Sequence, residues 1–76
     1  MLNNEINNFV GKKIKELRQE KELTQMELSK MIRVDESILA YYEEGLLELT
    51  VSKLHALAEN LDVSYSFFLP KQKRVK

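Results

Sequence analysis

Few residues in this 76-residue chain could support catalysis or metal binding. It contains one histidine, His55, two glycines and no cysteine, so it offers no histidine pair, no thiolate and no glycine-rich phosphate loop. Glu43 and Glu44 are adjacent, so on a helix their carboxylates would point about 100° apart and would not converge. The sequence therefore predicts neither an enzyme nor a metal or cofactor site.

Charge is distributed unevenly along the chain, although the formal net charge is zero. Residues 22–62 carry three basic and nine acidic side chains, whereas residues 63–76 carry four basic side chains and no acidic one. Residues 1–21 carry five basic and three acidic side chains. An acidic middle segment disfavours contact with phosphates, which most nucleic-acid binders neutralise with lysine and arginine.

Other bulk features exclude several classes of protein. Without cysteine the chain forms no disulfide, and no apolar run approaches the about 20 residues that span a bilayer. The N-terminal stretch MLNNEINN lacks the basic and apolar regions of a signal peptide. We therefore expect a single small domain that stays in the cytoplasm and contacts no membrane.

The residues that could position a functional surface lie between Leu23 and Gly45. Thr24 and Glu27 have the spacing of a capping box, which predicts the start of a helix. Asp35 can cap a second helix, and Gly45 can end that helix in the left-handed conformation. Two helices of about two turns joined by a short turn have the outline of a helix-turn-helix.

The flanking segments are also predicted to be helical. A helix from Ile6 or Phe9 to about Lys21 is indicated by apolar residues at helical spacing, namely Ile6, Val10, Ile14 and Leu17. A fourth helix, capped by Thr50 or Ser52, would bury a stripe made of Val51, Leu54, Leu57, Ala58 and Leu61.

After the fourth helix, Ser64 can cap a fifth and final helical turn, which Pro70 ends. We therefore expect an all-α fold, a compact five-helix domain over residues 9–69. A flexible N-terminal arm over residues 1–8 and a basic, disordered tail over residues 70–76 would flank this domain.

The central stretch resembles the helix-turn-helix of the phage-repressor and Cro-like (Xre-type) family of regulators. The matching residues are Leu23-Thr24-Gln25, Glu27-Leu28, Lys30, Val34, Ser37, Leu39 and Tyr42-Glu43 followed by Gly45. The resemblance runs from about Val10 to Phe68 and implies a lambda-repressor-like fold. It also implies a bacterial or phage-encoded transcriptional regulator, with repression as the expected activity, that binds double-stranded DNA as a homodimer.

The resemblance assigns roles to individual residues. The second helix of the motif would enter the major groove with the side chains of Glu36, Ser37, Ala40 and Tyr41 facing the bases. Thr24, Gln25 and Lys30 would hold the DNA backbone. Glu43 would be a structural partner for a basic side chain or a helix end. No cofactor, metal or small-molecule substrate is implied.

Two departures from the family pattern leave an alternative function open. Arg33 occupies the turn position where the family normally has glycine, so the turn would be strained by about 1 kcal/mol or differently shaped. The loop after Gly45 carries Leu46 and Leu47 where the family usually has basic or amide side chains. Exposed leucines and an acidic motif would also suit a protein-interaction module that lost DNA binding and binds a partner regulator.

The same leucines allow a second prediction about assembly. A homodimer formed by the loop, the fourth helix and the C-terminal aromatic residues would fit a palindromic DNA site. An antitoxin-type regulator of a two-gene cassette is a third alternative, and it would share the DNA chemistry of the first.

Overall fold

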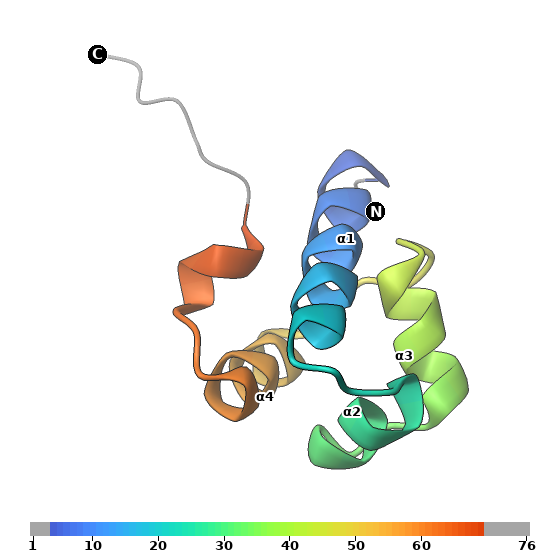
Figure 1. Cartoon of the computed structure of the whole chain (residues 1–76). Helices are drawn as coiled ribbons and strands as arrows, with labels where there is room; N and C mark the ends of the chain where they lie inside the picture. The colour runs from blue at the N-terminus through green and yellow to red at the C-terminus, as the bar shows by residue number, and fades with distance from the viewer. Residues whose placement is uncertain (1–3, 70–76) are drawn as a thin grey trace.

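A computed structural model of the protein describes residues 4–69, which fold into four α-helices and one short 3-10 helix (Figure 1). In chain order these are α1 (Asn4–Glu20), α2 (Gln25–Met31), α3 (Glu36–Glu43), α4 (Val51–Leu61) and the 3-10 helix η1 (Tyr65–Phe68). No strand occurs among the described residues, so the all-α prediction is confirmed. The count of five helices needs correction, because the last element is a single 3-10 turn.

The first helix begins earlier than its sequence predicts. Residues 4–8, assigned to a flexible arm, are the first residues of α1, while residues 1–3 and 70–76 lie outside the described residues. Asn7 is buried, and Asn8 lies so close to Gly45 that a Cβ on the glycine would come 3.1 Å from the Asn8 Cα. Contacts with later elements therefore accompany helix formation in this polar segment.

The apolar faces of the helices meet in one core. Its fully buried side chains are Ile14, Leu28, Ile32, Leu39, Leu57, Leu61 and Phe68. One predicted core position is wrong, because Val51 is 72% exposed; Ile6, which belongs to the apolar pattern of the first helix, is also 41% exposed. Both lie in the first turn of their helices.

Gly11 allows α1 and α3 to cross at close range. A Cβ at this position would lie 2.6 Å from the carbonyl oxygen of Glu43, which is too close for any side chain. The glycine thus brings the middle of α1 against the end of α3, the helix that would read DNA.

Each of the four described α-helices is followed, within two residues, by a residue in the left-handed conformation. The φ angles are 59° at Glu22, 62° at Arg33, 75° at Gly45 and 58° at Asp62. In each case the following N–H bonds to the carbonyl five residues earlier, as in a Schellman motif. The turn at Arg33 therefore keeps the ordinary shape without glycine and carries the steric strain of a side chain.

Candidate nucleic-acid interface

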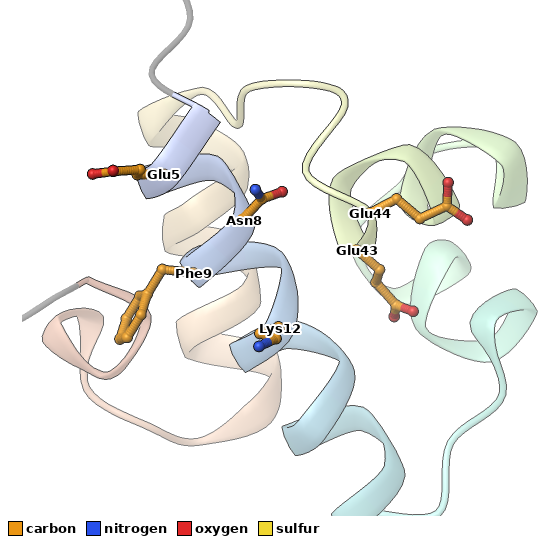
Figure 2. A pocket seen from close by; sticks show the side chains of 6 residues that line it. All are labelled: Glu5, Asn8, Phe9, Lys12, Glu43 and Glu44. Atoms are coloured by element: carbon orange, nitrogen blue, oxygen red, sulfur yellow. The ribbon is translucent and has the colours of Figure 1, made fainter.

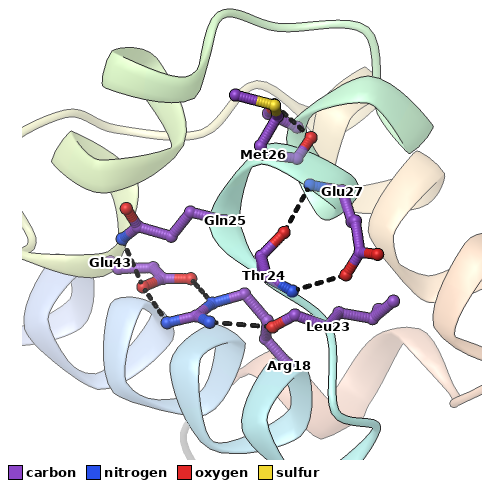
Figure 3. A network of polar contacts seen from close by, with 8 residues as sticks. Arg18, Leu23, Thr24, Gln25, Met26, Glu27 and Glu43 are labelled. Carbon is purple, nitrogen blue, oxygen red and sulfur yellow. Dashed lines mark hydrogen bonds and ion pairs between the residues drawn. The ribbon is translucent and has the colours of Figure 1, made fainter.

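The helix-turn-helix begins at an exposed capping box. The Thr24 hydroxyl oxygen accepts the N–H of Glu27 at 3.0 Å, and the Thr24 N–H donates to the Glu27 carboxylate at 2.8 Å (Figure 3). This reciprocal pair satisfies two N–H groups at the start of α2. The capping box predicted from the sequence is confirmed.

A buried ion pair joins the three helices around this start. The guanidinium of Arg18 donates to both carboxylate oxygens of Glu43, with Nε to Oε2 at 2.6 Å and Nη2 to Oε1 at 3.1 Å (Figure 3). Arg18 Nη1 also donates to the carbonyl of Leu23 at 2.9 Å, and the Gln25 amide donates to Glu43 Oε1 at 3.0 Å. These four residues, which we call the Arg18 network, connect the end of α1, the entry to α2 and the end of α3.

The Arg18 network shows the partners of two residues to which the sequence had assigned roles. Glu43 was expected to pair with a basic side chain, and this prediction is confirmed: its side chain is 2% exposed and bonded to Arg18. Gln25 was expected at the DNA backbone, yet its half-buried amide donates to Glu43 within the protein. From the sequence, Arg18 belongs to the polar, basic face of the first helix, and this prediction is wrong, because its side chain is 11% exposed and paired with Glu43.

The outer face of α3 is open to solvent. Glu36, Ser37 and Tyr41 are exposed, the last by 48%, whereas Ala40 is only half exposed. Ser37 and Tyr41 are four residues apart and therefore lie one above the other on the same side of the helix. The structure brings these predicted contacts together on one face, while Leu39 and Tyr42 pack into the core on the other.

The remaining predicted positions show smaller differences. Thr24 and Lys30 are exposed, as a backbone contact requires. Asp35 occupies the N-cap position of α3, as predicted, but its side chain makes no capping hydrogen bond. Burial raises the pKa of the Tyr42 phenol, which therefore stays protonated at neutral pH.

An open hollow of about 580 Å³ lies between the start of α1 and the end of α3. Figure 2 shows its lining side chains, and Glu5 and Phe9 point away from Glu43 and Glu44. No group of three His, Cys, Asp or Glu residues within positions 4–69 is placed to hold a metal ion. None of the described helices has the length and apolarity needed to cross a bilayer.

Comparison with known proteins assigns the chain to a family. The helix-turn-helix family model matches residues 14–68. An uncharacterized HTH-type transcriptional regulator from Rickettsia conorii is 36% identical over 63 residues, which cover 83% of this chain and 50% of the relative. The antitoxin PezA of Streptococcus pneumoniae is 30% identical over 57 residues, covering 75% of this chain and 36% of the antitoxin. The chain thus spans half or less of the length of these curated relatives.

Solved structures share the same fold. The restriction-modification controller protein C.AhdI from Aeromonas hydrophila superposes with a TM-score of 0.79 at 25% identity, covering 83% of this chain and 96% of the controller protein. The DNA-binding domain of BldD superposes with a TM-score of 0.80 at 24% identity, over 91% and 100% of the two chains. The chain therefore belongs to the helix-turn-helix family, in its phage-repressor and Cro-like (Xre-type) group.

Proposed function

We propose that this protein is a sequence-specific repressor that inserts α3 into the major groove of double-stranded DNA. The observation that carries the proposal is the two-sided character of α3. Its outer face exposes Ser37, Tyr41 and Glu36, while its inner face is held by the core and the Arg18 network. A reading helix needs such support, because base contacts depend on side chains held in one orientation.

The start of α2 would hold the DNA backbone. Thr24 and Lys30 are exposed and polar, and each would contact a phosphate oxygen. Gln25 would act beside them, with its side chain keeping α2 against α3 through Glu43. Ala40 would contribute a small apolar contact, for example to a thymine methyl group.

Assembly as a homodimer would match the two halves of a palindromic operator. Leu46 is 61% exposed and Leu47 is 36% exposed, and Val51 at the start of α4 is 72% exposed. These three apolar side chains form the candidate dimer surface. Phe68 is fully buried in the core, so of the C-terminal aromatic residues only Tyr65 and the half-buried Phe67 could contribute.

Selection of the purified protein on randomised duplex DNA, at roughly 50 and 200 mM salt, tests the proposal. A binder that makes several phosphate contacts should lose orders of magnitude in affinity across this range and keep its preferred sequence. An enriched palindrome with half-sites about 10 bp apart would support a dimeric repressor. Absence of enrichment at both salt concentrations would overturn the proposal.

The exposure of Leu46 and Leu47 also favours a second candidate, the interaction module that binds a partner regulator instead of DNA. The two candidates predict different binding surfaces. For the module, Leu46→Ser and Leu47→Ser would abolish partner binding and Ser37→Ala would not. For the repressor, Ser37→Ala would weaken DNA binding in a chain that still dimerises. Similarity to an antitoxin is compatible with the repressor, since both would bind an operator.

A further inference from the structure

Lys53 reaches from α4 to the turn of the helix-turn-helix. Its ammonium nitrogen donates to the carbonyl of Ile32 at 2.9 Å and lies 3.4 Å from the carbonyl oxygen of Arg33. Ile32 is the C-cap residue of α2, and Arg33 is the left-handed residue that follows it. One side chain from a later helix therefore bonds to the two peptide groups that redirect the chain from α2 toward α3.

The position of Lys53 is unfavourable for its own helix. It lies in the first turn of α4, where Thr50 caps its N–H at 3.1 Å and where no acidic residue is present. A cation near a helix N-terminus is repelled by the positive end of the helix dipole. The carbonyls at the end of α2 carry the opposite partial charge. The attraction between these carbonyls and the ammonium therefore offsets the repulsion from the start of α4.

The contacted turn is also the strained part of the motif. Arg33 has a φ of 62° without being glycine, and the turn is otherwise closed by backbone bonds from Val34 to Ser29 and from Arg33 to Lys30. These two bonds engage the N–H groups of the turn and leave the Ile32 and Arg33 carbonyls free to accept the Lys53 ammonium. Lys53 supplies the third constraint, and it comes from outside the motif.

We propose that Lys53 is a positioning residue for DNA recognition: it holds the Ile32–Arg33 turn so that α3 presents Ser37 and Tyr41 in one orientation. Because its ammonium is already engaged by two carbonyls, Lys53 acts through the turn and does not contact phosphate. The consequence for DNA rests on the proposed function, whereas the effect on the turn can be measured in the free protein.

The test compares Lys53→Met, which keeps an unbranched apolar stem but removes the donors, with Lys53→Arg, which restores a cation. Lys15→Met is the matched control, because Lys15 is an exposed lysine of α1 and also loses one charge. Thermal unfolding first defines a temperature at which every variant is folded. Amide hydrogen exchange is then measured at Val34 and at the core residue Leu57, and affinity for the selected DNA is measured across salt concentrations.

We expect Lys53→Met to accelerate exchange at Val34 relative to Leu57 and to weaken specific DNA binding about tenfold or more, as loss of a charged hydrogen bond implies. The slope of log affinity against log salt should stay that of the wild type. Lys53→Arg should recover most of both losses, and Lys15→Met should leave the exchange of Val34 unchanged.

Three results would overturn the proposal. A salt slope reduced by about 0.9 in Lys53→Met would make Lys53 a phosphate contact. Unchanged exchange at Val34 would mean that the turn does not depend on Lys53. Faster exchange with wild-type DNA affinity would limit Lys53 to a role in stability. If instead the wild-type protein binds no DNA at any salt concentration, the proposed function fails, and exchange at Val34 still decides whether Lys53 holds the turn.

Discussion

The two faces of α3 carry similar residues in different surroundings. On the inner face, the Glu43 side chain is 2% exposed and bonded to Arg18 and Gln25. On the outer face, the nearby Glu44 is exposed, and so is Glu36, which lies two turns before Glu43 at the edge between the two faces; neither forms an ion pair within residues 4–69. One carboxylate is therefore structural and the other two contribute negative charge to the surface.

This difference changes how the acidity of the motif should be interpreted. A count over residues 22–62 includes Glu43, but its charge is balanced by Arg18, which lies outside that segment. The charge of a linear segment thus overstates the negative charge on the face that DNA would meet. The relevant quantity is the set of exposed, unpaired side chains around Ser37 and Tyr41.

The largest expected effect comes from breaking the inner face. Arg18→Met leaves Glu43 buried without its cation, and removing one partner of a buried pair costs about 3–5 kcal/mol. Urea unfolding should show this loss in the free energy of unfolding. Glu44→Gln, at the exposed C-cap of the same helix, should change stability by less than about 0.5 kcal/mol. Similar stability of Arg18→Met and the wild type would show that the pair is not structural.

A second change tests the crossing that places this inner face against α1. Gly11→Ala introduces a Cβ 2.6 Å from the carbonyl oxygen of Glu43 and should destabilise the protein by about 1–3 kcal/mol. The sign of the stability change is informative. In the absence of tertiary contacts, replacing a helical glycine by alanine stabilises the helix by about 1 kcal/mol. Thermal unfolding measures the effect, with Gln19→Ala as an exposed control in α1. A more stable Gly11→Ala protein would contradict the close crossing.

Changes on the outer face should separate binding from folding. Ser37→Ala and Tyr41→Ala should each weaken specific DNA binding by about 1–3 kcal/mol, the range for a lost base contact. Their stabilities should stay within about 0.5 kcal/mol of the wild type, since both side chains are exposed. Titration of labelled operator DNA measures the first quantity and urea unfolding the second. Unchanged binding in both variants would show that α3 is not the reading helix.

The smallest expected effect concerns Glu36, an exposed carboxylate at the start of α3. Glu36→Gln removes a negative charge that would approach phosphates, so affinity for non-specific DNA at low salt should rise by a few-fold. Glu5→Gln is the control, because Glu5 lies at the start of α1 beside the opposite end of α3. Equal gains in both variants would indicate a general charge effect and not a specific place for Glu36 at the DNA.

Much of the fold followed from local patterns. The capping box at Thr24, the left-handed Gly45 and the burial of Leu54, Leu57, Ala58 and Leu61 are all as predicted. These features depend on neighbours within a few residues, so spacing alone reveals them. The first turns of α1 and α4 were less predictable, because burial at Ile6 and Val51 depends on which elements lie opposite them.

The candidate site was predictable only in part. The exposed positions Glu36, Ser37 and Tyr41 followed from helical spacing once the motif was identified, although their contacts with DNA stay a prediction. The family resemblance implied that Gln25 supports the reading helix, but spacing could not identify its partner Glu43, which is 18 residues away. Lys53, which bonds to a carbonyl 21 residues earlier, was not singled out at all.

By itself, the sequence determined the helices, their caps and the helix-turn-helix outline, because hydrophobic periodicity and capping act over one or two turns. Tertiary structure alone decided that Arg18 is the partner of Glu43, that Lys53 reaches the turn and that Ile6 and Val51 stay exposed. The physical reason is that charge pairing and burial depend on distances between helices. Arg18 and Glu43 are 25 residues apart in the chain and 2.6 Å apart in the fold.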